Sequence, residues 1–368
     1  LKGWDVARSY LRAQELAREA LTFDEQFAEA HALLALALAA QYTHMKEPSS
    51  ILEAEEVAAR AVQLSPALPE AYEALGTVQL LRGQSVTAAQ AFATGLRLAP
   101  GNDALCRRIA DAYSELDRDE EAESMYRKAV DLRPGLWENH NAIGVFYLER
   151  GRFEDAEVSL RRVIELNPGS SWGYTNLAAM HILKGEHEKA EPLLRASLRL
   201  DPDHDTHNNL GFVYYTMGRF EDAAEQWALA IGSGSHRPMF YANLGDAYRQ
   251  LGQMADARRA YERAIDLGRE QLEIKPGNWE SRAMISTALA GLGRCDDARD
   301  ETERAVIDAG KNPTVYYYAA IASVLCNDMT IATRYAGQAI EGGIVADVRT
   351  NPDLLPLLDD PSIRALLQ

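Results

Sequence analysis

The chain has 368 residues, with 38 Lys and Arg against 55 Asp and Glu, which gives a formal net charge of −17. Nucleic-acid binding needs clustered cationic side chains, so this acidic balance excludes DNA and RNA from the partners we expect. The longest uncharged apolar run, residues 32–40, is too short for membrane insertion, which takes about 20 residues. The chain begins with Leu1 rather than Met, so we expect a fragment or a processed product of a longer protein.

A period of 34 residues runs along most of the chain. Pairs of a large apolar residue and a small residue recur at 75–76, 109–110, 143–144, 177–178, 210–211 and 244–245. Small residues recur at 54, 88, 122, 156, 190, 223, 257, 298 and 332, and prolines recur at 66, 100, 134, 168 and 202. Because three independent series share nearly the same step, the sequence predicts a repeat architecture.

Residues 137–167 show how one repeat is built. The segments WENHNAIGVFYLERG and RFEDAEVSLRRVIELN are predicted to be two helices that cross at Gly144 and Ala156. Gly151 can adopt the left-handed conformation that ends the first helix, and Pro168 cannot continue the second. The unit resembles the tetratricopeptide repeat, a helix-turn-helix of 34 residues. This resemblance implies an all-α fold, a right-handed superhelix or α-solenoid with a concave face made mainly by the first helix of each repeat.

Three regions follow one another in the predicted organisation. Residues 1–27 match the end of an earlier repeat, and residues 28–344 contain nine repeats. The step from residue 257 to residue 298 is 41, so the second helix of the seventh repeat is expected to be longer. Residues 345–368 are predicted to be a capping segment, because a solenoid must cover its last apolar face. The whole chain is expected to form one continuous superhelix.

The order of these parts resembles the C-terminal repeat region of bacterial multidomain signalling proteins such as Hanks-type serine/threonine kinases. The resemblance rests on residues 1–42, on the long helix AYERAIDLGREQLEIKPGN and on the tail VRTNPDLLPLLDDPSIRALL. It implies an upstream kinase or another signalling domain. The chain itself has no kinase motif, neither the Gly-rich loop nor His-Arg-Asp nor Asp-Phe-Gly.

No catalytic residue, cofactor site or metal site is predicted. The chain lacks a Walker loop, a His-Glu-x-x-His motif and a Gly-x-Ser-x-Gly motif. The GSGS sequence at 232–235 has no Lys and follows a helix, so we expect a connector there. The segment 201–207 combines three Asp and two His, but Asp-Pro-Asp commonly caps the next helix. We therefore predict that this segment binds no metal.

The three cysteines, Cys106, Cys295 and Cys326, are widely spaced and contain no Cys-x-x-Cys pair. This spacing predicts neither a disulfide framework nor a zinc site. Cys295 and Cys326 are expected to be ordinary small residues in inter-helix turns.

The concave face carries the candidate binding residues. Asn176, Asn209 and Asn243 occupy the same groove position in three consecutive repeats. An amide offers an acceptor and two donors, which match the polar groups of an extended peptide backbone. The series resembles the asparagine ladder of O-GlcNAc transferases. Asn-Leu-Gly is, however, also a common sequence at this place in the generic repeat. The predicted peptide-binding residues are Asn176, Asn209, Asn243, Trp172, Asn208, Phe212, Tyr215 and Asp246.

A protein-interaction scaffold that binds a protein or an extended peptide in its groove is the predicted function. The alternative is a structural or self-association module, which an exposed apolar patch on the convex face would favour. The Lys and Asn pattern of the chaperone-tail clamp is absent around Asn209, so recognition of an acidic tail is not expected. Arg107 and Arg108 mark a second, charged groove that could select a charged ligand.

Overall fold

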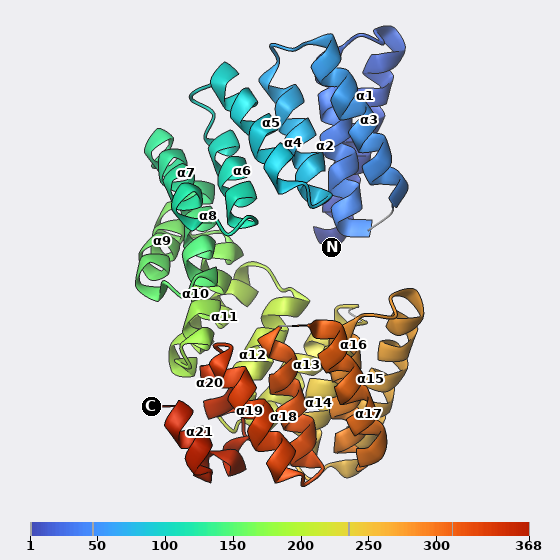
Figure 1. The fold of residues 1–368 in the computed structure, drawn as a ribbon, viewed down its shortest axis with the longest axis vertical. Coiled ribbons are helices and arrows are strands. Elements are labelled where there is room, and N and C mark those ends of the chain that lie inside the picture. Colours follow the sequence, from blue (N-terminus) through green and yellow to red (C-terminus); the bar gives the residue numbers. More distant parts are fainter. Residues whose placement is uncertain (1, 46–47, 235, 311, 368) are drawn as a thin grey trace. The chain divides into compact units, whose positions relative to one another are not determined.

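The structure, a computed structural model, describes residues 2–45, 48–234, 236–310 and 312–367 (Figure 1). Over these residues the chain forms 21 α-helices and one 3-10 helix, and it contains no strand. The predicted all-α solenoid of helix pairs is confirmed. Residues 46–47, Ser235 of the predicted GSGS connector, Lys311 and the two terminal residues lie outside the described residues.

The chain divides into two compact units, Leu1–Asn167 and Pro168–Gln368, here called unit 1 and unit 2. The repeat pattern, from which one continuous superhelix was predicted, does not indicate this division. Each unit has hydrophobic clusters of its own, one of them around Leu34 and Val78 in unit 1 and another around Trp227 in unit 2. In a solenoid each repeat packs mainly on its neighbours, so the repeat pattern does not require one common core.

The described residues of unit 1 form nine helices, and α2 to α9 pack as four consecutive pairs. Their bounds are α1 (Lys2–Phe23), α2 (Ala28–Met45), α3 (Pro48–Leu64), α4 (Pro69–Leu81), α5 (Ser85–Leu98), α6 (Asp103–Ser114), α7 (Asp119–Leu132), α8 (Trp137–Glu149) and α9 (Phe153–Leu166). Each pair corresponds to one repeat of the sequence.

Unit 2 contains five further pairs and a C-terminal segment of short helices. The pairs are α10 (Ser171–Leu183) and α11 (His187–Leu200), α12 (His204–Thr216) and α13 (Phe220–Gly232), α14 (Pro238–Gln250) and α15 (Met254–Ile274), α16 (Trp279–Gly291) and α17 (Cys295–Ala309), α18 (Pro313–Leu325) and α19 (Met329–Glu341). The C-terminal segment comprises α20 (Val345–Thr350), the 3-10 helix η1 (Leu355–Asp359) and α21 (Pro361–Leu366). Helix α15 has 21 residues, which accounts for the long step in the seventh repeat.

Glycine allows the two helices of a pair to approach closely. A Cβ atom on Gly245 in α14 would lie 2.5 Å from the ring of Tyr261 in α15. A Cβ atom on Gly211 in α12 would lie 2.8 Å from the ring of Trp227 in α13. The ring therefore fills the space that a side chain would need, and the large and small residues of the repeat are matched across the pair.

Cys295 and Cys326 form a disulfide, with their Cα atoms 5.5 Å apart. The prediction that these residues are unpaired is therefore wrong. Cys295 begins α17 and Cys326 follows α18, so stacking of the eighth and ninth repeats brings two turns together that are 31 residues apart in the sequence. Cys106 is free and buried in unit 1.

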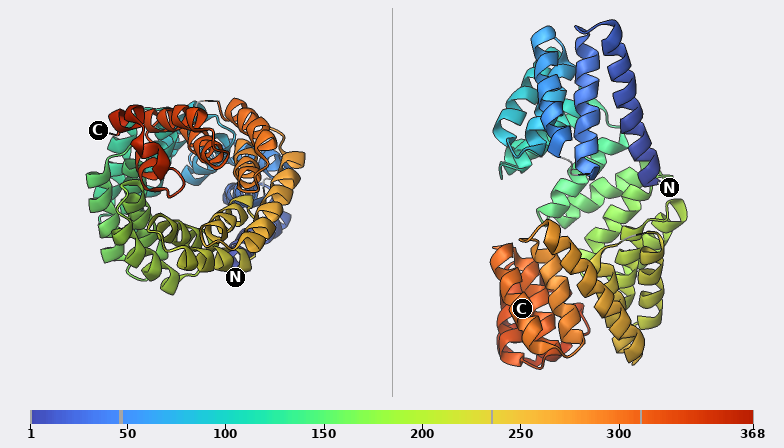
Figure 2. Two further views of the ribbon diagram at one scale, coloured as in Figure 1. Left: turned by 90° about the horizontal axis from the view of Figure 1, so that it is seen from below. Right: turned by 90° about the vertical axis from the view of Figure 1, so that its right-hand side faces the viewer.

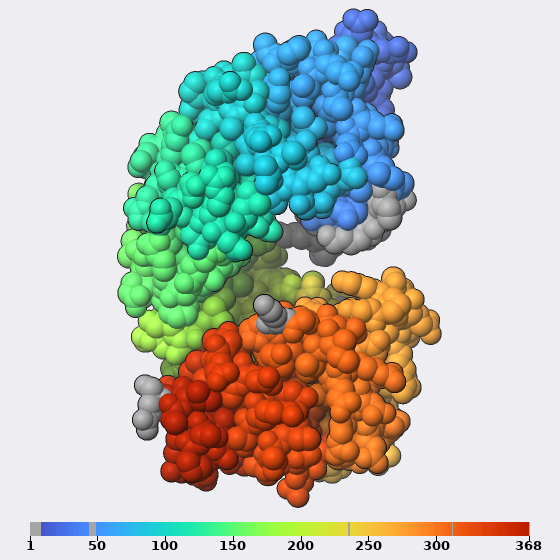
Figure 3. Space-filling view, viewed as in Figure 1, coloured from blue at the N-terminus to red at the C-terminus, as the bar shows by residue number. Residues whose placement is uncertain are grey.

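The C-terminal segment packs against α19 and α18 through apolar side chains. Val348, Leu354, Leu357 and Ile363 are buried in one cluster with residues of those two helices. The surface of the segment is continuous with the surface of α18 and α19 (Figure 3). The same segment also projects toward the inner side of unit 2, where α20 contacts α10 (Figure 2, left). It therefore touches both the last repeat and a repeat far earlier in the chain.

Candidate functional site

The first helices of several unit 2 repeats surround a cavity of about 130 Å³ on the concave side. Residues of α12, α14, α16 and α18 line it, together with Trp227 of α13 and Asn351 of the C-terminal segment. Six of the eight residues that the sequence proposed for peptide binding lie on its wall, namely Asn208, Asn209, Phe212, Tyr215, Asn243 and Asp246.

The amides on this wall differ in their hydrogen bonding. The Nδ2 atom of Asn243 donates to Oδ1 of Asn208 at 3.2 Å, and Nε1 of Trp227 donates to the same oxygen at 3.1 Å. Asn209 is half-buried, and its amide makes no hydrogen bond to another described residue. Asn209 therefore offers a free amide, while Asn208 and Asn243 hold each other in place.

The other two proposed residues, Trp172 and Asn176, belong to α10 and do not line the cavity. Trp172 is 62% exposed. Asn176 is half-buried and interacts with another part of the chain. The structure therefore brings the α12 and α14 positions of the amide series into one cavity, but not the α10 position.

Apolar side chains form the rest of the wall. Met239, Met284 and Tyr318 line this cavity and also a neighbouring one of about 420 Å³, to which Trp279 contributes. Methionine and aromatic side chains adapt well to the apolar parts of a ligand. The two cavities thus share a wall that joins apolar surface to a few amide groups.

A buried polar cluster, here called the Asp353 cluster, lies beside the cavity where α12 and α14 meet the C-terminal segment. The carboxylate of Asp353 accepts hydrogen bonds from Nη2 of Arg249 at 2.6 Å, the hydroxyl of Tyr215 at 2.8 Å and Nε2 of Gln250 at 2.9 Å. Asp353 and Tyr215 are both buried. The cluster is thus a carboxylate held by three donors in a place that water scarcely reaches.

A second carboxylate, that of Asp246, lies on the other side of Arg249. It accepts a hydrogen bond from the Tyr261 hydroxyl at 2.6 Å and lies 3.7 Å from Nη2 of Arg249. Burial raises the pKa of Asp246 to about 7; Arg249 opposes this shift, and nearby Asp353 adds to it. Burial likewise raises the pKa of Tyr215 well above its usual value, so its hydroxyl remains a donor.

Sequence reasoning identified Tyr215 and Asp246 but missed Arg249, Gln250 and Asp353. Arg249 stands three residues after Asp246, a spacing that places both on one face of a helix and could have suggested an ion pair. No sequence signal indicated that Asp353 reaches a residue 104 positions earlier, because that contact depends on the curvature of the stack.

The Asp and His residues of segment 201–207 have capping and packing roles in the structure. The carboxylate of Asp203 caps α12 by accepting from the backbone N–H groups of Asp205 and Thr206, both at 2.9 Å. His207 contacts Gln226 on α13 instead. Among the described residues, no group of three or more His, Cys, Asp or Glu side chains is arranged to hold a metal ion. None of the helices described is both long and apolar enough to span a membrane.

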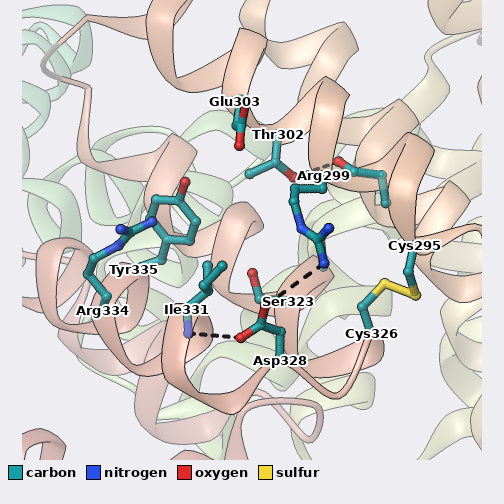
Figure 4. A pocket seen from close by; sticks show the side chains of 12 residues that line it. Cys295, Arg299, Thr302, Glu303, Ser323, Cys326, Asp328, Ile331, Arg334 and Tyr335 are labelled. Atoms are coloured by element: carbon teal, nitrogen blue, oxygen red, sulfur yellow. Dashed lines mark hydrogen bonds and ion pairs between the residues drawn. A yellow bond between two sulfur atoms is a disulfide. The ribbon is translucent and has the colours of Figure 1, made fainter.

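The disulfide borders a small pocket of about 50 Å³ between α17 and the α18–α19 pair (Figure 4). Arg299 and Asp328 point toward each other within it, with Nη2 and Oδ2 4.0 Å apart. A volume of this size accepts only a few water molecules, so the concave cavity is the better candidate for a peptide.

Three family models described as tetratricopeptide repeat match residues 105–135, 147–210 and, in two overlapping matches, 208–278 and 243–314. Together these matches cover more than half of the chain. The comparison with curated proteins gave no match.

Solved structures of similar fold share little sequence with the chain. The human IFIT1 dimer with PPP-AAAA is 19% identical, with a TM-score of 0.53, over 83% of this chain and 69% of that one. A tetratricopeptide repeat protein from Parabacteroides merdae ATCC 43184 is 19% identical, with a TM-score of 0.50, over 69% of this chain and 98% of that one. The Cut9–Hcn1 hetero-tetramer of the APC/C is 16% identical, with a TM-score of 0.50, over 98% and 72%. At these identities the likeness shows the fold alone.

Proposed function

Because the chain belongs to the tetratricopeptide-repeat family, we propose that it is a protein-interaction scaffold that binds an extended peptide in the concave cavity of unit 2. The observation that carries this proposal is the convergence of amide, aromatic and methionine side chains from α12, α14, α16 and α18 on one cavity. Amides suit the backbone of a peptide without regard to its sequence, and the aromatic and methionine side chains suit its apolar residues.

Asn351 gives a second line of support, since a residue in extended conformation already forms part of the cavity wall. Its backbone is extended, with φ −68° and ψ 123°, and its side-chain Nδ2 donates to the Tyr317 hydroxyl at 2.6 Å. The cavity wall thus already includes one non-helical residue that a side-chain hydrogen bond holds in place. A peptide lying beside Asn351 would meet the free amide of Asn209.

We also propose, on the resemblance of the opening segment and the tail, that the chain is one region of a larger bacterial signalling protein. An upstream kinase or other signalling domain remains a prediction from that resemblance. The alternative of self-association without a peptide site receives less support. The most exposed large hydrophobic side chains, Phe23, Val158, Ile274 and Ile307, lie on four different helices.

The experiment is a peptide-display selection on the chain, followed by affinity measurements with Asn209→Ala and Asn176→Ala. Asn209 can give a peptide backbone up to two hydrogen bonds, each worth about 0.5–1.5 kcal/mol, so its replacement should weaken binding about tenfold. Asn176→Ala is the matched control, because it changes the same repeat position outside the cavity. Equal affinities for wild type and Asn209→Ala would contradict the proposed site and move the search to the charged groove near Arg107 and Arg108.

A further inference from the structure

The C-terminal segment makes two contacts of different kinds. On one side its apolar residues pack on α18 and α19. On the other side its polar residues cross to much earlier repeats, where Asp353 meets Arg249 and Tyr215, and Thr350 lies 3.2 Å from Nε2 of His187 in α11. The first contact is sufficient to cover the last repeat. The second contact places a carboxylate among the first helices of the middle repeats.

Two of the three donors to Asp353, Tyr215 and Arg249, are held in place by residues outside the C-terminal segment. The ring of Tyr215 packs against the rings of Phe220 and Trp227, with centroids 5.3 Å and 5.7 Å apart. The Nε atom of Arg249 donates to the Tyr261 hydroxyl at 3.2 Å, and that hydroxyl donates to Asp246. Helices α12 to α15 therefore position the hydroxyl and the guanidinium without help from Asp353.

Without Asp353, this donor set would be left with unmet hydrogen-bonding capacity. Asp246 balances the formal charge of Arg249, but it does not accept from Tyr215 or Gln250 in the structure. Buried donors that lose their acceptor are costly, so the site favours another carboxylate in the same place.

The donor set also adjoins the proposed peptide cavity. Tyr215, which donates to Asp353, lines that cavity, and so do Asp246 and Asn351. A peptide that lies along the wall past Asn209 would therefore reach this cluster with one of its side chains. The inference that follows rests on the proposed function for this path of entry.

We propose that Arg249, Tyr215 and Gln250 form a binding site for the carboxylate of an acidic side chain in a partner peptide, and that Asp353 fills this site in cis. The tail and the partner then compete for the same donors. The guanidinium comes from the last turn of α14 rather than from the positions of the chaperone-tail clamp, whose absence led us not to expect acidic recognition.

The probe is a fluorescently labelled synthetic peptide with the chain's own sequence 346–358, ADVRTNPDLLPLL, and a second version with Asn in place of its second Asp. Anisotropy would measure the binding of each peptide to wild type, Asp353→Ala and Asp359→Ala. Asp359 is the matched control, because it lies in the same tail, is exposed and pairs with Arg364 rather than with the groove. We expect Asp353→Ala to bind the acidic peptide at least tenfold more tightly than wild type or Asp359→Ala does, and the Asn peptide to show no such gain.

Adding Tyr215→Phe or Arg249→Gln to Asp353→Ala should reduce or abolish that gain. Tyr215→Phe keeps the ring and removes one donor, so it serves where Arg249→Gln disturbs folding, as judged by circular dichroism. Equal binding of the acidic peptide by wild type and Asp353→Ala, or a gain that the Asn peptide shares, would overturn the proposal.

The Asn209→Ala substitution separates this inference from the proposed function. If it weakens display-selected peptides while Asp353→Ala gives no acid-dependent gain, the carboxylate site is wrong and the cavity stands. An acid-dependent gain that Asn209→Ala leaves unchanged supports the carboxylate site and overturns the proposed path along Asn209.

Discussion

Units 1 and 2 are built from the same repeat, but their polar side chains connect repeats over different distances. In unit 1, ion pairs such as Arg150–Asp119 and Arg152–Glu123 join adjacent repeats, 31 and 29 residues apart in the sequence. In unit 2, Asp353 bonds to Tyr215 across 138 residues. In the same nearest-neighbour architecture, therefore, polar contacts can stay between adjacent repeats, as in these ion pairs of unit 1, or connect distant repeats, as the C-terminal segment does in unit 2.

The difference bears on cooperativity. In a stack held by neighbour contacts, stability is close to a sum over repeats and their interfaces, so damage stays local. Contacts of the C-terminal segment with α10 and α14 make the intervening repeats depend on both ends of unit 2. We therefore expect unit 2 to unfold more nearly as one body than unit 1, and three measurements test this contrast.

The largest expected effect comes from Arg249→Ala. It leaves the buried Asp353 and the half-buried Asp246 without their cation, and breaking a buried pair such as Arg249–Asp353 costs about 3–5 kcal/mol. Urea unfolding monitored by hydrogen exchange should show the loss in helices α10 to α19. The control in unit 1 is Arg152→Ala, whose side chain is 40% exposed, and it should cost less than about 1 kcal/mol. Equal losses of unfolding free energy from the two substitutions would contradict the expected contrast between the units.

Reduction of the Cys295–Cys326 disulfide should give the next largest effect. The bond closes a loop with a sequence separation of 31, and a disulfide of this kind contributes about 2–4 kcal/mol. Thermal melting with and without dithiothreitol should show a lower midpoint for unit 2 only. The Cys295→Ser variant should melt at the midpoint of the reduced wild type, and dithiothreitol should not change that midpoint. A lower midpoint for unit 1 on reduction would contradict the assignment of the effect to this disulfide.

The smallest expected effect is a difference in pH response. Burial raises the pKa of Asp246 from 3.8 to about 7, so this group stabilises unit 2 fully below pH 4, and that contribution is lost as the pH rises toward 7. Hydrogen bonding to Arg152 lowers the pKa of Glu123 in unit 1 from 4.5 to about 2, so its contribution is lost in the opposite direction, on acidification. Between pH 6 and 7 the Asp246 effect should be on the order of 1 kcal/mol.

The control for this measurement is Asp246→Asn, which cannot ionise and still accepts from Tyr261. The unfolding free energy of this variant should be measured at several pH values. Most of its decline between pH 4 and pH 7 should be absent. The half-buried Asp347, with a pKa raised to about 6, contributes with the same sign and should leave a smaller residual slope. An unchanged slope in Asp246→Asn would assign the pH response to Asp347 alone.

The helix pairs could be predicted from sequence because each depends on residues close together in the chain. Gly245 and Tyr261, which meet across α14 and α15, are 16 positions apart in the sequence, and the same spacing separates Gly211 from Trp227. Asn327 also replaces glycine at a helix end with φ 58°, a conformation that Asn tolerates better than most residues. Almost all of the fold could therefore be predicted from local periodicity.

The contacts that sequence reasoning missed depend on how successive pairs rotate against one another. The Cys295–Cys326 bond requires two equivalent turns to stack, and the Arg249–Asp353 pair requires the tail to meet a helix several repeats earlier. Periodicity sets the step length but not the accumulated rotation. For the same reason the α10 position of the amide series, Asn176, could not be separated from Asn209 and Asn243 before the cavity was seen.

Because Asp353 lies near the end of the chain, the groove residues are synthesised before the carboxylate that fills their site. A ribosome adding about 5–20 residues per second would need roughly 5–20 s to proceed from Arg249 to Asp353, which lies 104 residues later. Repeats of a solenoid can fold as they emerge, so α12 to α15 can be assembled throughout this interval. For those seconds the guanidinium of Arg249 has only Asp246 as its acidic neighbour in the cluster, and a nascent chain can meet an acidic peptide before its own tail exists.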